Sequence, residues 1–202
     1  MGLKLSEYRM ETAEDIIRQV IKESIQVKVD ILEDNVALIA QIASQLAHIF
    51  SNSGKVVLFG NGGSAADAQH VAAEFVSRFR MDRDALPAIA LTTDTSIITS
   101  IGNDSSFDQI FARQVRALVS KGDLVAGIST SGNSPDVLMG IIAAKEKGAF
   151  TIGFTGRSGG RLAELVDTAF CVPSVSTARI QEAHITVWHE ICEIVEQELF
   201  GV

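Results

Sequence analysis

The sequence predicts an α/β protein built on a five-stranded parallel sheet that is flanked by helices. Two observations lead to this fold class. Five short apolar runs alternate along the chain with longer segments of helical periodicity, a pattern typical of parallel sheets with right-handed crossovers. Several of these runs end in turns rich in glycine, serine and threonine, at the edge where such sheets bind ligands. The 202 residues are enough for one sizeable core, so we expect a single domain, 1–202.

The composition argues against several classes of partner. The net charge is −8 and no run of lysine or arginine occurs, so we expect no direct binding of nucleic acid. The sequence has no signal peptide and no apolar stretch of about 18 residues, so we expect no membrane association. The two cysteines, Cys171 and Cys192, form no metal-binding spacing and suit a reducing environment. We therefore expect a cytoplasmic protein.

Helical periodicity from about residue 11 to residue 50 predicts two helices ahead of the first strand, with a cap at Asp34-Asn35 between them. Their apolar stripes consist of Ile17, Ile21 and Ile25 in the first helix and Ile39, Ile42, Leu46 and Ile49 in the second. A small sheet alone does not cover two such stripes. We therefore expect residues 1–52 to be an N-terminal helical oligomerisation segment and residues 53–202 to be the α/β core with its C-terminal helix. The alternative is that both helices only cover one face of the sheet.

The first strand is expected at 56–59, followed by a glycine-rich turn at 60–64, with Ser64 as the N-cap of an alanine-rich helix. Glycine lets a ligand approach the main chain closely at the helix N-terminus. His70 and Glu74 are four residues apart and thus on one face of that helix, where they can hold a metal ion or move a proton. The alternatives are an ordinary turn and a surface pair. The turn matches neither the dinucleotide-binding pattern nor the P-loop, so nucleotide binding is not expected.

The later elements follow the same alternation. Further strands are expected at 87–91, 124–128, 150–154 and 169–172, and further helices at 107–118, 135–147 and 178–200, with a short helix after a glycine-rich turn at 156–160. The remaining connections are a charged connector at 78–84 and a polar turn at 92–96. Because ligands of parallel sheets bind beyond the carboxyl ends of the strands, the turns at those ends should form one polar, uncharged crevice.

A cluster of hydroxyl side chains follows the strand expected at 124–128. It consists of Ser129, Thr130, Ser131 and Ser134. Ser134 suits the N-cap and Pro135 the first position of the next helix. Hydroxyl and N–H donors at the positive end of a helix suit a phosphate monoester. An ordinary capped turn explains one or two of these hydroxyls but not all of them, so we expect phosphate binding here.

The C-terminal helix carries a further pair of polar side chains. Gln181 and His189 are eight residues apart, which places them two turns apart and rotated by about 80° on an ideal helix. Both can therefore meet a ligand from one side of the helix. His184 is displaced around the helix and is expected to be a packing or surface histidine. No spacing rule connects this helix to His70 and Glu74.

The motifs resemble those of one known family. The segments GNGGSAADAQHVAAEF, LPAIALTTD, GND, GISTSGNSPDV and RIQEAHITVWHEICEIVE are similar to those of the bacterial phosphoheptose isomerases, which are single sugar-isomerase (SIS) domain enzymes. The resemblance runs from about residue 11 to the C-terminus. It implies interconversion of sedoheptulose 7-phosphate and D-glycero-D-manno-heptose 7-phosphate through an enediol, the first step of nucleotide-activated heptose biosynthesis. It also implies a homotetramer with active sites shared between subunits, and one Zn²⁺ ion per subunit.

The same resemblance assigns roles to residues of this chain. The zinc ligands would be His70, Glu74, Gln181 and His189. Glu74 would be the catalytic base and His189 the acid/base imidazole, and a zinc ion near both would stabilise the developing enediolate. Glutamine is an unusual zinc ligand, so catalysis without metal stays open. Contacts to the sugar would come from Asn61, Gly62, Gly63, Glu74, Asn103, Asp104 and Gln181, and contacts to the phosphate from Ser129, Thr130, Ser131 and Ser134.

Two other functions are compatible with an SIS domain. Some close relatives are tetrameric regulators that bind the bacterial replication-initiator protein, but these typically lack the equivalents of Glu74 and His189. Other SIS domains isomerise or bind a different sugar phosphate, such as a hexosamine phosphate, and the fold alone does not choose between substrates. An acid at position 74 and a histidine at position 189 favour the heptose enzyme.

Overall fold

A computed structural model describes residues 12–201 of the chain. The helices are α1 (Ala13–Asp34), α2 (Val36–Ser51), α3 (Gly63–Val76), α4 (Thr95–Asp104), α5 (Ile110–Leu118), α6 (Pro135–Glu146), α7 (Gly160–Leu165) and α8 (Thr177–Phe200), with a 3₁₀ turn η1 (Phe107–Gln109) before α5. The strands are β1 (Val56–Gly60), β2 (Ala88–Ala90), β3 (Leu124–Ile128), β4 (Phe150–Thr155) and β5 (Thr168–Cys171).

The five strands form one parallel sheet, as the sequence predicts, and their order in it is β2-β1-β3-β4-β5. After β1 the chain adds β2 on one side and then crosses back to add β3 on the other side. The strand order therefore reverses between β1 and β3, and in parallel sheets of this order the ligand crevice lies at that switch point. The turns after Gly60 and Ile128, which are register partners, flank this crevice.

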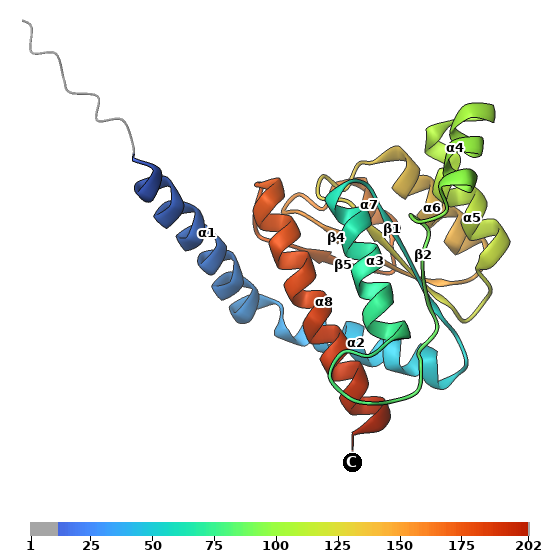
Figure 1. The fold of residues 1–202 in the computed structure, drawn as a ribbon, viewed down its shortest axis with the longest axis horizontal. Coiled ribbons are helices and arrows are strands. Elements are labelled where there is room, and N and C mark those ends of the chain that lie inside the picture. The colour runs from blue at the N-terminus through green and yellow to red at the C-terminus, as the bar shows by residue number, and fades with distance from the viewer. Residues whose placement is uncertain (1–11, 202) are drawn as a thin grey trace, which may run out of the picture.

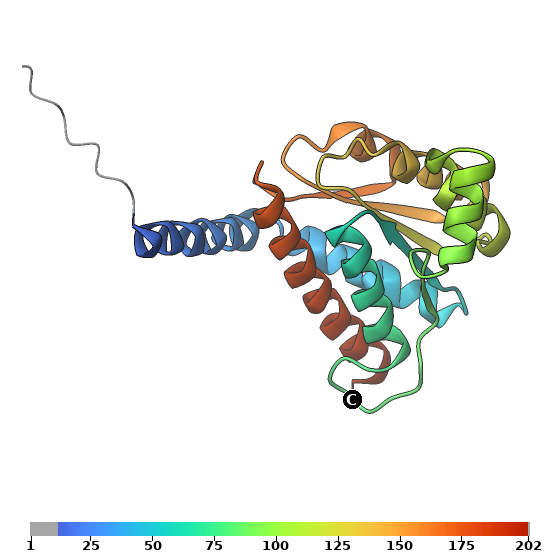
Figure 2. The ribbon, with the colours of Figure 1, turned by 45° about the horizontal axis from the view of Figure 1, so that its top comes forward.

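Helices cover both faces of the sheet (Figure 1, Figure 2). Side chains alternate along β1: Val56 and Leu58 join the core beneath α2, α3 and α8, whereas Val57 and Phe59 join the core beneath α5 and α6. All five residues of β1 are buried. The apolar run that predicts this strand is continuous because both of its faces are covered.

The two N-terminal helices differ in what they cover. Ile39, Ile42, Leu46 and Ile49 of α2 are buried against the body of the protein. Helix α1 instead extends away from the body (Figure 1), and Ile17, Ile21 and Ile25 are 57%, 53% and 56% exposed. The predicted stripe of α1 therefore has no partner within residues 12–201. No helix in that range combines the length and the apolar character that crossing a membrane needs.

Two local predictions were wrong. Helix α3 begins at Gly63 with Gly62 as its N-cap, because Gly62 adopts a positive φ of 54° that turns the chain into the helix early. Ser64 is therefore a buried helical residue rather than the cap. The polar turn predicted at 92–96 is shorter: the chain turns at 91–93 and α4 begins at Thr95, because the Asp94 side chain accepts the N–H of Ile97 at 2.9 Å and caps the helix.

His184 of α8 is a core residue. It is fully buried, its Nε2 lies 3.2 Å from the backbone oxygen of Thr155, and its ring meets Phe154 edge-on. Trp188, one turn further along, stacks on the same phenylalanine with ring centroids 4.5 Å apart. Burial lowers the pKa of His184 to about 4, although the bond to Thr155 opposes this effect. The histidine is therefore neutral at pH 7.

We expect His184 to make the protein less stable in mild acid. Between its folded pKa of about 4 and the ordinary value of 6.5, only the unfolded chain binds a proton at this residue, so stability falls as the pH drops. The contribution is about 2 kcal/mol between pH 7 and pH 5. Urea unfolding at these two pH values should show that much more loss in the wild type than in His184→Gln, which keeps an N–H donor near Thr155. Equal losses would contradict the buried neutral histidine.

Candidate functional site

The site forms where α3 and α8 run side by side in the same direction (Figure 1). The first residue of α3, Gly63, meets the second turn of α8, since a Cβ atom at Gly63 would lie 2.5 Å from Nε2 of Gln181. The carboxamide of Gln181 therefore occupies the space that glycine leaves open. Any larger residue at position 63 would push this side chain away from the turn after β1.

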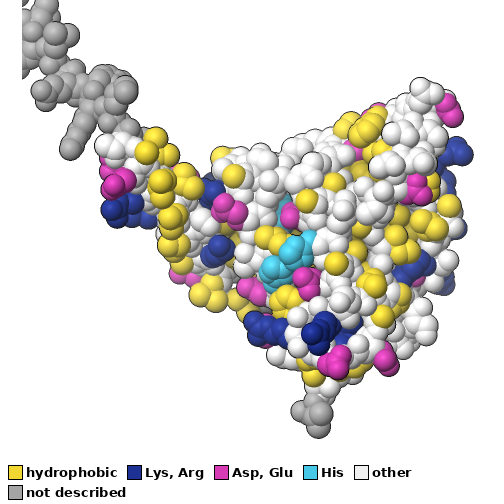
Figure 3. Space-filling view, viewed as in Figure 1, with side chains coloured by type: hydrophobic (Ala, Val, Ile, Leu, Met, Phe, Trp, Pro, Cys, Tyr) yellow, Lys and Arg dark blue, Asp and Glu magenta, His cyan; other side chains and the backbone are white. Residues whose placement is uncertain are grey.

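Further along the two helices, His70, Glu74 and His189 come together. His70 Nε2 lies 3.1 Å from Glu74 Oε1 and 3.1 Å from His189 Nε2. One ligand atom from each of the three residues lies within 4.8 Å of the other two. His70 is exposed, and the other two are half-buried. Figure 3 shows histidine side chains at the surface between these helices, next to acidic ones.

The surroundings of this cluster favour a neutral imidazole at His189. Partial burial lowers the pKa of His189, and the neighbouring His70 lowers it further, while Glu74 opposes both effects. The ring of Phe79 lies 5.4 Å from that of His189 and closes one side of the cluster. A neutral imidazole has an unprotonated nitrogen, which can accept a proton or bind a metal ion.

Asp67 lies one turn before His70 on α3. Burial raises its pKa to about 6, although the nearby His70 opposes this effect. Its Oδ2 atom is buried and has no hydrogen-bond partner within residues 12–201.

The three-residue cluster fits a divalent cation such as zinc. Two imidazoles and a carboxylate are common zinc ligands. In a tetrahedral site with bonds of about 2.1 Å, neighbouring ligand atoms lie roughly 3.4 Å apart, close to the 3.1 Å between His70 Nε2 and each of its two neighbours. Gln181 lies level with Gly63, which is seven residues before His70, or about 10 Å along the helix axis. The structure thus brings together three of the four predicted ligands within one chain.

The hydroxyl cluster after β3 is compact. Ser129 Oγ lies 2.9 Å from Ser134 Oγ and 3.5 Å from Ser131 Oγ. Ser134 is the N-cap of α6 and Pro135 its first residue, as predicted, but the Ser134 hydroxyl bonds to Ser129 rather than to the helix. Thr130, which lies between Ser129 and Ser131 in the sequence, is half-buried. These hydroxyls lie at the positive end of α6, which suits an anion.

Asn61 and Asp136 connect the turn after β1 to the start of α6. Asn61 Nδ2 donates to both carboxylate oxygens of Asp136, at 3.0 and 2.8 Å. Asp136 is 2% exposed, and this burial raises its pKa, opposed by the bond from Asn61. Because its nitrogen is engaged, Asn61 presents its oxygen as the free acceptor. The sequence offers no spacing signal for this pair.

Asn103 and Asp104 are the last two residues of α4. Both are exposed, and Asn103 Nδ2 donates to Asp104 Oδ1 at 2.8 Å. Asn61 and Gly62 instead line a cavity of about 110 Å³ that continues to Thr92 and Phe107. This cavity lies beyond the carboxyl ends of β1 and β2, on the side where α4 and α5 begin.

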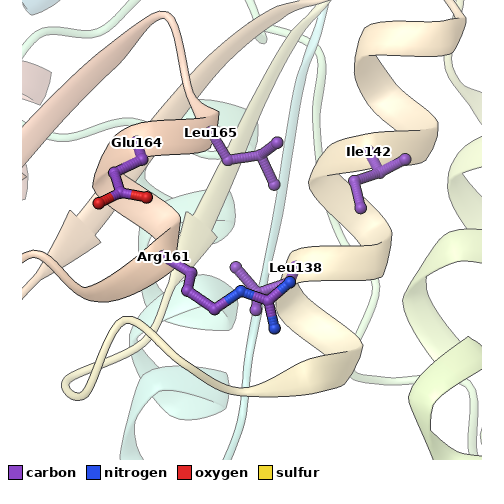
Figure 4. A pocket seen from close by; sticks show the side chains of 5 residues that line it. All are labelled: Leu138, Ile142, Arg161, Glu164 and Leu165. Atoms are coloured by element: carbon purple, nitrogen blue, oxygen red, sulfur yellow. The ribbon is translucent and has the colours of Figure 1, made fainter.

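A separate cavity of about 260 Å³ lies between α6 and α7 (Figure 4). It is lined by Leu138, Ile142, Arg161, Glu164 and Leu165. None of the predicted site residues lines it, so it is not a candidate for the chemistry of the His70 cluster.

Comparisons with known proteins agree on one family. Residues 19–156 match the model of the SIS domain family. The chain is 58% identical over 180 residues to a phosphoheptose isomerase of Roseiflexus sp., covering 89% of this chain and 91% of the relative. It is 52% identical to a phosphoheptose isomerase of Aquifex aeolicus, covering 90% and 95% of the two chains.

Two solved structures support the same family. The phosphoheptose isomerase of Neisseria gonorrhoeae superposes with a TM-score of 0.88 at 43% identity, covering 92% of this chain and 100% of that one. The enzyme of Francisella tularensis gives a TM-score of 0.90 at 39% identity, covering 93% and 100%.

Proposed function

The chain belongs to the SIS domain family and, within it, to the phosphoheptose isomerases, and from this premise we propose that it interconverts sedoheptulose 7-phosphate and D-glycero-D-manno-heptose 7-phosphate. This reaction would begin the synthesis of nucleotide-activated heptose. The observation that carries the proposal is the meeting of Glu74, His70 and His189 between α3 and α8. A carboxylate and imidazoles within reach of one another are the groups that proton transfer between two carbons needs.

In the direction from ketose to aldose, Glu74 takes the proton from C1 of the sugar. The electron pair of the broken C–H bond forms the double bond of an enediol between C1 and C2. A proton moves from the oxygen on C1 to the oxygen on C2 through the imidazole of His189. Glu74 then returns its proton to C2, so that no group is gained or lost. Partial burial lowers the pKa of His189, which favours the neutral imidazole that accepts the proton from the oxygen on C1.

The two turns at the switch point, one after β1 and one after β3, would position the substrate. The hydroxyls of Ser129, Ser131 and Ser134 would hold the phosphate at the N-terminus of α6. Asn61 would accept a sugar hydroxyl with its free oxygen. Because Asp136 joins both turns through Asn61, the phosphate and the sugar are held in one fixed relation. Binding energy from the phosphate end is thereby used to orient the reacting carbons.

We propose that the His70 cluster holds one Zn²⁺ ion per subunit, through His70, Glu74 and His189. Gln181, the fourth predicted ligand, packs against Gly63 at a distance from these three residues and stays a prediction. When bound, zinc would supply positive charge that stabilises negative charge on the sugar oxygens. The carboxylate of Glu74 has two oxygens, so one can face the cation while the other faces the substrate. The side chain of His70 would then bind the cation and take no part in the proton transfers.

The exposed stripe of α1 supports the proposal of a homotetramer with active sites shared between subunits. Large exposed apolar stripes on a helix mark protein interfaces. Arg179 joins the N-terminal half of α1 to α8, because its Nη1 donates to the backbone oxygen of Val20 at 3.1 Å. An assembly through α1 would therefore place subunit contacts next to the start of α8. The unpaired cysteines suit a reducing compartment, and we propose the cytoplasm.

We expect the purified protein to convert sedoheptulose 7-phosphate to the heptose 7-phosphate, followed by NMR with and without a chelator. Glu74→Gln should lower turnover by a factor of about 10²–10⁴, because an amide cannot act as the general base. Glu146→Gln, on the exposed part of α6, is the matched control and should keep full activity. Full turnover in Glu74→Gln would refute the assigned base.

Ser131→Ala should raise the KM for the sugar phosphate by about tenfold or more, since it removes one hydrogen bond to a charged group. Turnover should fall less, because the phosphate lies away from the reacting carbons. Steady-state kinetics measure both parameters. Ser44→Ala, whose hydroxyl bonds to Glu198 on the far side of the core, serves as the control. An unchanged KM would count against the phosphate role.

Ile17→Glu combined with Ile21→Glu should dissociate the assembly, because two buried charges would replace apolar contacts at the proposed interface. Light scattering after size-exclusion chromatography should give the mass of four chains for the wild type and a smaller mass for the variant. Gln19→Glu, on the same helix, should leave the mass unchanged. A wild-type chain that is monomeric at micromolar concentration would contradict the tetramer.

A further inference from the structure

The charged connector between α3 and β2 is exposed along most of its length, but one of its charged side chains is buried. The sequence places three arginines and two aspartates in residues 78–84. The side chain of Arg83 is only 1% exposed, as is that of its partner Glu196. Their closest approach joins Arg83 Nε to Glu196 Oε1 at 2.9 Å. A charge pair so completely removed from water requires a reason beyond surface solubility.

Glu196 receives more than this one bond. Its carboxylate accepts the backbone N–H groups of Phe79, Arg80 and Met81, at 2.8, 2.9 and 2.9 Å. With Arg83, four donors converge on the two carboxylate oxygens. Glu196 therefore attaches the connector to α8 along three consecutive residues.

The remaining nitrogens of Arg83 reach the end of α3. Nη2 donates to the backbone oxygen of Glu74 at 2.9 Å, and Nη1 donates to that of Phe75 at 2.7 Å. Both are among the last residues of α3, where carbonyl groups lack partners within the helix. A cation at this end also complements the helix dipole. Arg83 thus caps the helix turn that carries Glu74.

We propose that the Arg83–Glu196 pair positions Glu74 of α3 against His189 of α8 and so sets the ligand spacing of the His70 cluster. Glu196 is seven residues after His189, which places it on the same face of α8 two turns further along. The pair therefore connects the backbone of one cluster residue to the helix that carries another. This inference rests on the proposed function of the cluster. Both members are positioning residues, because neither belongs to the cluster itself.

The forked guanidinium is essential to this role. Arginine donates from three nitrogens in one fixed plane, whereas lysine donates from a single point. Arg83→Lys keeps the buried charge pair but cannot reach Glu196, Glu74 and Phe75 together. Glu196→Gln keeps the size of the acceptor but replaces one of its two acceptor oxygens with an NH₂ donor that faces backbone N–H groups.

The test is a titration of the metal-free full-length protein with Co²⁺, followed by calorimetry and by the visible absorption of the bound ion. Arg83→Lys and Glu196→Gln should bind Co²⁺ about 10–100-fold more weakly than the wild type, the usual cost of losing an outer-shell partner. The absorption spectrum of bound Co²⁺ should also change, because it reports ligand geometry. Lys55→Met is the matched control, since it breaks the pair with Asp123 at the opposite end of β1. It should lower the melting temperature but leave Co²⁺ affinity within about twofold of the wild type.

Unchanged Co²⁺ affinity and spectrum in both variants, measured well below their melting temperatures, would overturn the proposal. An equal loss of Co²⁺ affinity in Lys55→Met would also overturn the proposal, because the weaker binding would then come from a general loss of stability. An Arg83→Lys chain that does not fold would also contradict it, since the pair would then serve folding only. If the wild-type chain binds no Co²⁺, the proposed cation site itself is refuted, and the proposed role of the pair in positioning its ligands is refuted with it.

Discussion

The parallel packing of α3 against α8 is the constraint on which the site depends. At one end the helices approach closely because Gly63 has no side chain and Gln181 fills the space. At the other end they are joined by polar bonds from the connector to Glu196. His70 and His189 meet between these two ends. A residue with a Cβ at position 63 would separate the helices or displace Gln181, so the glycine is a packing requirement as well as a means of ligand access.

The sheet supplies the second half of the site by its strand order. Because the order reverses between β1 and β3, their turns lie on either side of one crevice. One turn presents an amide oxygen from Asn61, and the other presents hydroxyls from Ser129 and Ser134. The buried carboxylate of Asp136 fixes the first of these groups and starts the helix whose positive end serves the second. The phosphate that we propose for this crevice would be held without lysine or arginine, because oriented dipoles replace the missing charge.

Much of this arrangement can be predicted from the sequence, because it depends on local patterns. The strands follow from apolar runs, and the pairing of His70 with Glu74 follows from helical spacing. The contact of these two residues with His189 cannot be predicted in this way, because helical spacing says nothing about contacts between helices that are far apart in sequence. Ser64 was a wrong choice of cap because the backbone angles of Gly62, not side-chain chemistry, start α3. The contacts of Asp136 with Asn61 and of Arg83 with Glu196 are also invisible in the sequence, since the partners are more than 70 residues apart.

A buried ion pair does not by itself argue for stability. Removing two charges from water costs several kcal/mol per ion, and apolar replacements are often as stable. The position of the Arg83–Glu196 pair therefore matters more than its energy. The hydrophobic effect is non-directional and does not by itself orient particular backbone groups. Hydrogen bonds from a planar guanidinium are directional and fix the backbone they reach. The nitrogen atoms of His70 and His189, on two different helices, lie 3.1 Å apart. Directional contacts hold such a spacing, and the Arg83–Glu196 pair supplies them between α3 and α8.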